Sequence, residues 1–256
     1  MANAKAPALS LLRMGSCFVD QSQLVVGLPA GVGWHQGPAN AWLVDAGDAL
    51  FLFDTGQPER LVERPWALFD PEGIHGDAIF PIMRPHDTIT ARLREAGYAP
   101  SAFDGAITSH WHFDHAGGMD ALAGCPILAQ RAEIDSVAAE RDKRPFWLRG
   151  EYDLRPLDGD TKLAPGVTLL STPGHTPGHQ SLLVETAGGP YLLTSDAVYT
   201  STNWEEEKPG AMADPATGVK SVARLKEVAR ETGARVIFSH DRVQGAELEP
   251  FPHWYR

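Results

Sequence analysis

The stretch that decides the fold of this chain is Ser109-His110-Trp111-His112-Phe113-Asp114-His115-Ala116-Gly117-Gly118. Three histidines and one aspartate fall within its positions 110–115. Histidine fills a core poorly and is not needed on a surface, so this density indicates imidazole nitrogens directed at a metal ion. Ile107-Thr108 predicts the end of a buried strand, and Gly117-Gly118 predicts a sharp turn at the start of a helix. We therefore expect the ligands on a loop that is fixed at both ends.

Short apolar strands that end in hydroxylated residues and then a potential ligand recur along the chain. They are Ile107-Thr108-Ser109-His110, Leu193-Thr194-Ser195-Asp196 and Ile237-Phe238-Ser239-His240, with a related ending at Phe51-Leu52-Phe53-Asp54. Strand ends in layered α/β folds gather at one rim, where sites are usually built. The pattern predicts that these four endings meet in space, with Asp54 beside the ligands and not among them.

A second histidine cluster, residues 172–179, combines proline and glycine in a rigid turn and offers His175 as a further ligand. We expect His179 to orient a neighbour by hydrogen bonding. The candidate ligands are five imidazoles and two carboxylates: His110, His112, Asp114, His115, His175, Asp196 and His240. This set is too large for one tetrahedral zinc ion and suits two divalent ions that share a carboxylate.

The predicted division gives one ion to His110, His112 and His175, and the other to Asp114, His115 and His240, with Asp196 as the bridge. A hydroxide between the ions would be the nucleophile, because two cations roughly 3.5 to 4 Å apart lower the pKa of a bound water to near neutrality. Nitrogen and oxygen ligands favour zinc and admit cobalt, manganese or iron.

Composition restricts the other classes of function. The 256 residues suit one large domain or two small ones, and we expect one domain spanning 1–256. A content of 43% hydrophobic and 21% charged residues is typical of a globular protein. The net charge of -11 and the lack of a basic stripe argue against a nucleic-acid partner. Without an apolar run of roughly 18 residues, no membrane span is expected. Residues 1–10 hold one lysine and no sustained apolar run, so we expect a cytoplasmic location. Cys17 and Cys125 form no C-x-x-C pair, so we expect no disulfide framework and no thiolate ligand.

Apolar periodicity predicts further elements on both sides of the histidine stretch. The predicted strands are a hairpin at 41–53 and segments 105–108, 125–129, 167–170, 180–184, 190–194 and 235–239; the predicted helices begin at Thr88, span 131–141, and carry the stripe Val219, Val222, Leu225 and Val228-Ala229. Residues 57–86 are predicted to be an irregular excursion that lines the substrate or forms a homodimer contact. Strand-rich blocks alternating with single helices favour sheets covered by helices.

Four segments together resemble the N-acyl homoserine lactonases of the metallo-β-lactamase superfamily: 54–59, 109–118, 172–182 and 193–200. The resemblance runs from about Asp54 nearly to the C-terminus, and the region before Asp54 and the excursion match loosely. It implies an α/β fold, the four-layered αββα sandwich, and opening of the lactone ring of N-acyl homoserine lactones, which degrades a bacterial signal. It also implies that Tyr199 donates a hydrogen bond to the carbonyl oxygen or oxyanion and that Asp114 gives a proton to the leaving alkoxide.

Other reactions of the superfamily stay open from the sequence. The same metal ligands suit another lactone or ester, such as a pyridoxolactone-like ring, or a thioester of the glyoxalase II type, although no basic cluster for a glutathione carboxylate is evident. A secreted β-lactamase is disfavoured by the lack of a cysteine ligand and of a signal peptide. Phe113 is expected either to line the substrate cavity or to pack in the core. Candidates for the acyl pocket are Met14, Phe18, Trp34, Phe69, Ile74 and Met83.

Overall fold

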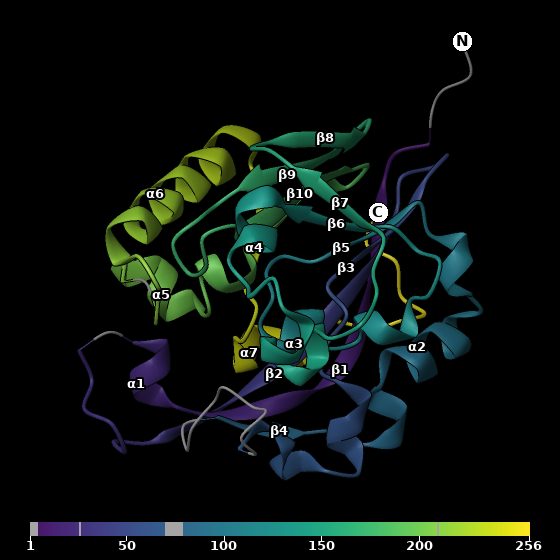
Figure 1. Ribbon diagram of the computed structural model, residues 1–256. Helices are drawn as coiled ribbons and strands as arrows, with labels where there is room; N and C mark the ends of the chain where they lie inside the picture. The colour runs from purple at the N-terminus through teal and green to yellow at the C-terminus, as the bar shows by residue number, and fades with distance from the viewer. Residues whose placement is uncertain (1–4, 26, 70–78, 209) are drawn as a thin grey trace.

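The computed structural model describes residues 5–25, 27–69, 79–208 and 210–256. Its first sheet has seven strands in the order β4-β1-β2-β3-β5-β6-β7 (Figure 1). The strands are β1 (Ala8–Asp20), β2 (Trp34–Asp45), β3 (Leu50–Phe53), β4 (Ile79–Ile82), β5 (Gly105–Ile107), β6 (Ile127–Gln130) and β7 (Leu154–Leu157). Strands β1 to β4 pair antiparallel, whereas β3, β5, β6 and β7 run parallel. The parallel half therefore brings the carboxyl ends of β3 and β5 to the same edge.

The second sheet has five strands in the order β12-β11-β10-β9-β8. They are β8 (Thr161–Ala164), β9 (Val167–Ser171), β10 (Gln180–Thr186), β11 (Gly189–Leu193) and β12 (Arg235–Ile237). Only β11 and β12 pair parallel, with Leu193 opposite Ile237. This pairing again places two strand ends that carry predicted ligands side by side.

The two sheets face each other across an apolar core, and helices cover their outer faces. Leu11, Val44 and Ile107 of the first sheet pack with Leu169 and Leu182 of the second, and all are buried. Helices α2 (Ile89–Ala96) and α3 (Phe113–Ala116) pack on the first sheet, and α5 (Ser201–Glu206) and α6 (Pro215–Thr232) on the second. The predicted four-layered αββα sandwich is confirmed. Shorter helices are α1 (Gln21–Leu24), α4 (Arg131–Asp135) and α7 (Arg242–Glu247).

Local chemistry explains where the longer helices begin and end. The Thr88 side chain accepts the Ala91 N–H at the start of α2, and Gly97 ends that helix with φ 78°. Asp214 caps α6 in the same way, and its last turn stops at Gly233 with φ 69°. Both glycines adopt the left-handed conformation that other residues disfavour.

Several predicted elements differ from the structure. The excursion 57–86 is not irregular throughout, because its described part holds β4 and 3₁₀ turns over Glu59–Val62, Pro65–Leu68 and Pro85–Asp87. The helix predicted over 131–141 ends at Asp135, and the strand predicted over 125–129 is β6, shifted toward its C-terminus. Gly117 and Gly118 follow α3, and Gly118 opens a single 3₁₀ turn over Met119–Ala121, which is shorter than the helix predicted there.

The apolar stripe predicted for α6 is only partly buried. Val219 is 49% exposed, and the buried positions are Gly218, Ser221, Val222 and Leu225. Small residues therefore form half of the face that packs inward. Within the described ranges, no helix combines the length and the apolar character needed to cross a membrane.

Candidate metal centre

Four strands deliver the predicted site residues to one rim of the sandwich. Asp54 follows β3, His110 follows β5, Asp196 lies in a 3₁₀ turn after β11, and His240 follows β12. His115 Nδ1 lies 2.8 Å from Asp54 Oδ2, and His240 Nε2 lies 3.2 Å from Asp196 Oδ1. The prediction that these strand ends meet is confirmed, and it joins ligands from both sheets.

The first group of possible metal ligands consists of His110, His112, His175 and Asp196. His110 Nε2 lies 3.0 Å from His112 Nδ1, and His175 Nε2 lies 3.1 Å and 2.9 Å from those two atoms. Asp196 Oδ2 completes the group at 3.6 Å from His110 Nε2 and 3.4 Å from His175 Nε2. Ligand atoms at ~2.0–2.1 Å from a tetrahedral ion are separated by about 3.3 Å, so the spacing fits one ion.

The second group consists of Asp114, His115 and His240. Asp114 Oδ2 lies 3.6 Å from His240 Nε2 and 3.8 Å from His115 Nε2. Asp196 Oδ1 lies 3.2 Å from each of those two imidazole nitrogens. Asp196 therefore turns one oxygen to each group, which is the arrangement a bridging carboxylate needs.

Two buried side-chain atoms of the ligand groups lack a hydrogen-bond partner in the described part of the chain, which also fits metal ions at this site. His115 Nε2 and Asp196 Oδ1 are buried and have no hydrogen-bond partner among the described residues. Buried polar atoms are nearly always satisfied, so such orphans require an explanation. A cation in each group would bind these atoms and the facing imidazole nitrogens. The seven predicted ligands thus come together in two groups that could hold two metal ions.

The outer nitrogens of the imidazoles hold them in the orientation that metal binding requires. His175 Nδ1 donates to the Ala211 carbonyl and His240 Nδ1 to the Pro38 carbonyl, both at 2.9 Å. His115 Nδ1 is held by Asp54 Oδ2, as expected for Asp54. A carbonyl only accepts, so Nδ1 carries the proton and Nε2 keeps its lone pair for the metal.

Asp54 makes more hydrogen bonds at this rim than the sequence indicated. Its carboxylate also accepts the Ser109 N–H at 2.7 Å and the Ser109 hydroxyl at 3.0 Å. The same hydroxyl lies 3.0 Å from His110 Nδ1. Asp54 holds a left-handed backbone with φ 61°, which a short polar side chain tolerates. One carboxylate thereby positions a histidine of each ligand group.

Burial lowers the pKa of some of the imidazoles, whereas neighbouring carboxylates raise the pKa of others. Burial lowers the pKa of His110 well below its usual range and that of His175 to about 4, so both are neutral. Burial also disfavours the charged form of His115, but the carboxylates of Asp196, Asp114 and Asp54 outweigh it and raise the pKa of His115. Burial opposes ionisation of Asp196, yet His115 and His240 hold its pKa well below its usual range.

His179 lies against the ligands without joining either group. Its Nδ1 lies 2.9 Å from the Thr172 hydroxyl and 3.1 Å from the Thr172 carbonyl oxygen, and its ring centroid lies 5.2 Å from that of His110. Burial lowers the pKa of His179 to about 3, which keeps it neutral. Its hydrogen bonds stabilise the turn that presents His175 and reach no ligand directly.

Glu133, at the centre of α4, is a residue that sequence reasoning missed. Its Oε1 accepts the Trp111 N–H and its Oε2 accepts the Gly178 N–H, both at 2.9 Å. Burial raises the pKa of Glu133, and the Thr176 side chain and the two N–H donors partly offset that effect. The carboxylate ties the loop that carries His110 and His112 to the turn that carries His175. The two N–H donors are backbone groups, which leave no signal in the sequence.

Tyr199 lies beside both ligand groups. Its hydroxyl donates to the Ala211 carbonyl at 3.1 Å and lies 3.1 Å from His175 Nδ1, and its ring lies 5.7 Å from that of His240. Burial, followed by the charges of Asp196 and Asp114, raises the pKa of Tyr199 well above its usual range, so the phenol stays protonated. A Cβ at Gly210 would lie 1.9 Å from the Tyr199 ring, so only glycine leaves room for it.

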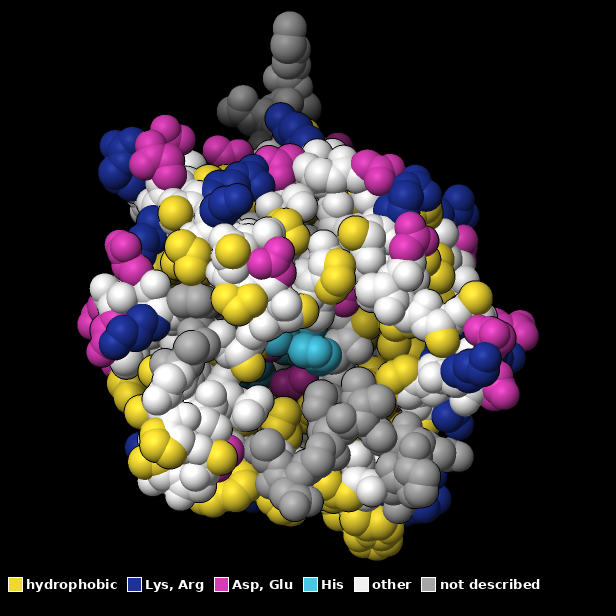
Figure 2. Space-filling view, turned by 60° about the vertical axis from the view of Figure 1, so that its left-hand side comes forward, with side chains coloured by type: hydrophobic (Ala, Val, Ile, Leu, Met, Phe, Trp, Pro, Cys, Tyr) yellow, Lys and Arg dark blue, Asp and Glu magenta, His cyan; other side chains and the backbone are white. Residues whose placement is uncertain are grey.

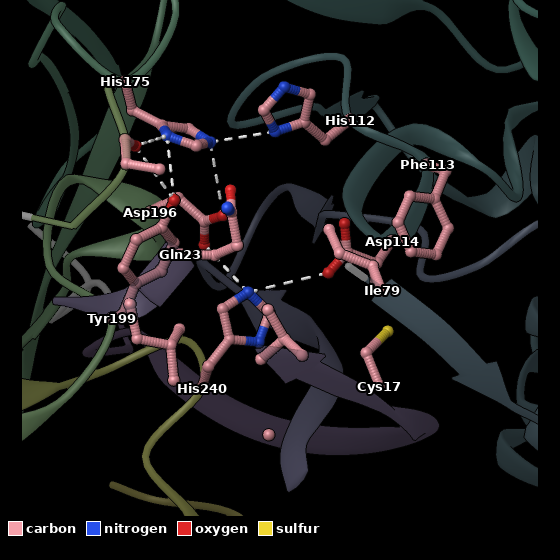
Figure 3. Close-up of a pocket in the computed structure, with 14 residues that line it drawn as sticks. Cys17, Gln23, Ile79, His112, Phe113, Asp114, His175, Asp196, Tyr199 and His240 are labelled. Atoms are coloured by element: carbon pink, nitrogen blue, oxygen red, sulfur yellow. Dashed lines mark hydrogen bonds and ion pairs between the residues drawn. The ribbon is translucent and has the colours of Figure 1, made fainter. Parts of the chain in front are cut away.

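The ligand groups form the floor of a cavity of about 270 Å³. Figure 2 shows histidine and acidic side chains at the bottom of this hollow, with hydrophobic side chains at its rim. The ligand end is lined by His112, Asp114, His175, Asp196 and His240, and the apolar wall by Cys17, Val19, Leu24 and Ile79 (Figure 3). The cavity therefore offers a polar floor and an apolar side wall.

Phe113 both lines the cavity and packs in the core, where its ring centroid lies 6.1 Å from that of Trp147. The residues predicted to form the acyl pocket lie elsewhere. Met14, Phe18, Trp34, Phe69 and Met83 do not line the cavity, and Ile74 falls outside the described residues. Met14 is fully buried in the core instead, against Gly56.

The fold is an α/β sandwich, and its site could hold two metal ions. Comparison with known proteins identifies the family. Residues 35–240 match the metallo-beta-lactamase superfamily, and the chain belongs to that superfamily. Within it the chain is a member of the N-acyl homoserine lactonase family. It is 36% identical over 247 residues to the N-acyl homoserine lactonase AiiA of Bacillus thuringiensis subsp. kurstaki, covering 96% of this chain and 98% of AiiA.

A more distant relative and two solved structures agree. The N-acyl homoserine lactonase AttM of Azorhizobium caulinodans is 32% identical over 213 residues, covering 73% of this chain and 77% of AttM. An N-acyl homoserine lactone hydrolase with the product N-hexanoyl-L-homoserine at its catalytic metal center is 36% identical, with TM-score 0.90 over 98% of this chain and 100% of that one. A variant of B. thuringiensis AiiA with N-decanoyl-L-homoserine at its active site is 35% identical, with TM-score 0.90 and the same coverage.

Proposed function

We propose that this protein is a metal-dependent hydrolase that opens the lactone ring of N-acyl homoserine lactones. The observation that carries the proposal is Asp196, whose two oxygens face two groups of possible ligands at the floor of a cavity that Tyr199 also lines. Family membership supports the same reaction, since the relatives are named N-acyl homoserine lactonases. The neutral, partly apolar substrate suits the cavity's apolar wall.

The proposed roles follow from the chemistry of the side chains. The two ligand groups would hold two divalent ions, which supply a water of lowered pKa and polarise the ester carbonyl. Tyr199 keeps its proton at neutral pH and can turn its O–H from the Ala211 carbonyl to the oxygen on which charge develops. Asp114 lies on the cavity wall, where its carboxyl group can carry a proton to the leaving alkoxide.

The test is hydrolysis of N-acyl homoserine lactones from N-butanoyl to N-dodecanoyl by metal-loaded protein, followed by proton release. We expect turnover, and we expect Tyr199→Phe to lower kcat by about 10- to 100-fold while the fold is kept, because one donor to the oxyanion is lost. No turnover on any member of the series, or preferential hydrolysis of a glutathione thioester, would overturn the proposal.

Four finer proposals accompany this function. Zinc is the proposed metal, because imidazole and carboxylate ligands suit it, and elemental analysis should find about two ions per chain. We propose a single domain spanning 1–256, which a single cooperative unfolding transition supports. We propose a cytoplasmic protein, since Cys17 and Cys125 are both free, and cell fractionation tests this. A homodimer through 57–86 is proposed from the exposed Trp66 and Phe80, and sedimentation measures it.

A further inference from the structure

Within the described part of the chain, the cavity lining has one strongly polar side chain outside the ligand groups and Tyr199. Among the described lining residues, Gln23 is the one that carries a carboxamide, and it adjoins Leu24 in a wall otherwise built from Cys17, Val19 and Ile79. Its carboxamide points into the cavity (Figure 3). This carboxamide makes no hydrogen bond to any described residue, although it offers two N–H donors and an accepting oxygen.

The backbone around Gln23 is firmly held. The Gln23 carbonyl accepts the Ala211 N–H at 2.9 Å, and the Leu24 carbonyl accepts from the Asn203 side chain at 2.7 Å. Asp20 caps α1 by accepting the Ser22 N–H at 2.9 Å. These bonds fix α1 against the segment that carries Tyr199, so the Gln23 side chain needs no role in holding the fold and is available to a ligand.

We propose that Gln23 recognises the amide of the N-acyl group and so determines specificity for N-acyl lactones. The inference rests on the proposed function. A secondary amide presents one N–H and one carbonyl, and a carboxamide can form a hydrogen bond with each. Its oxygen accepts from the N–H and its NH₂ donates to the carbonyl. An amide buried against the apolar wall without such a partner would be penalised by desolvation. The alkyl chain then lies along Val19, Leu24 and Ile79.

The test compares two lactones that differ only in the amide. One is N-hexanoyl homoserine lactone, and the other is an α-alkyl-γ-butyrolactone of equal chain length, with methylenes in place of the amide. Gln23→Met keeps the length of the side chain and removes its hydrogen bonding. We expect kcat/KM for the N-acyl lactone to fall about five- to tenfold, mainly through KM, and that for the alkyl lactone to stay unchanged. Gln21→Met, on the same short helix but lining a neighbouring groove, should leave both values unchanged.

Binding of ring-opened N-hexanoyl-L-homoserine to metal-loaded protein, measured by calorimetry, gives a readout that needs no turnover. Gln23→Met should weaken it by the same five- to tenfold factor. Equal loss for both lactones, or unchanged product affinity, would overturn the inference. Failure of the wild type to turn over either lactone would count against the proposed function, while product binding would still test Gln23. Gln23→Glu, which keeps the acceptor and removes the donor, should also lose affinity and serves if the Met variant does not fold.

Discussion

Removal of the Glu133 carboxylate is expected to damage both the fold and the metal centre. The side chain is 2% exposed and accepts the Trp111 and Gly178 N–H groups, each at 2.9 Å. Glu133→Ala leaves both N–H groups buried without an acceptor, at about 1–3 kcal/mol each, so the free energy of unfolding should fall by about 2–6 kcal/mol. Glu133→Gln keeps one accepting oxygen and should lose about 1–3 kcal/mol.

Metal affinity should fall as well, because Trp111 stands between two candidate ligands and Gly178 lies in the turn that presents His175. Loss of groups that orient ligands typically lowers metal affinity 10–100-fold, which we expect for Glu133→Gln. Chelator competition with zinc measures the affinity, and urea unfolding of the metal-free protein measures stability. Glu140→Gln is the matched control, since Glu140 pairs with Lys143 at the surface and should change stability by less than ~0.5 kcal/mol. Wild-type affinity and stability in Glu133→Gln would refute the role given to this carboxylate.

Three further perturbations are expected to have measurable effects. Gly174→Ala should lower the free energy of unfolding by about 2 kcal/mol or more, because φ is 135° and a Cβ would lie 2.4 Å from the Gly218 backbone. Gly218→Ala should lose less stability, because the closest contact of its Cβ is the flexible Met212 side chain. Equal losses in thermal unfolding would contradict this. Burial opposes ionisation of Asp241, but hydrogen bonds from Ser201 and from backbone N–H groups lower its pKa, so its stabilisation is present above the unfolded-state pKa near ~4 and is lost as pH falls below it. The stability difference between wild type and Asp241→Asn should therefore shrink between about pH 4 and pH 2, and a constant difference in urea titrations would count against the assignment. Chelation of the metals should lower Tm and zinc should restore it, by mass action on the folded state; a Tm insensitive to both would contradict metal binding by these residues.

The ligands could be predicted from sequence because their signals are local and their residue types are distinctive. Histidines two positions apart mark a site without any knowledge of the fold, and strand ends such as Leu193-Thr194-Ser195-Asp196 indicate a common rim. Glu133 could not be predicted, since it reaches Trp111 across 22 residues and Gly178 across 45, and both partners are backbone groups. Gln23 lies on a helix of four residues, which has no periodicity to detect.

The fold was harder to predict where packing and not periodicity decides it. Strand β1 is buried on both faces for most of its length, so its sequence lacks the alternation that marks a half-exposed strand. Strand β4 pairs with β1 although β2 and β3 lie between them in the sequence, as Phe80 opposite Phe18 shows. Helix α4 stops early because the Ser136 hydroxyl donates to the Glu133 carbonyl at 2.7 Å, a contact that competes with further helix.

Because the ligands are divided between the two sheets, metal binding is linked to the cooperativity of unfolding. His110, His112, Asp114 and His115 follow the first sheet, whereas His175, Asp196 and His240 belong to the second, and each group draws on both. Neither sheet alone can complete a coordination shell. Bound metal would therefore act as a cross-link between segments far apart in the chain, and release of either ion would report that the two sheets have begun to separate.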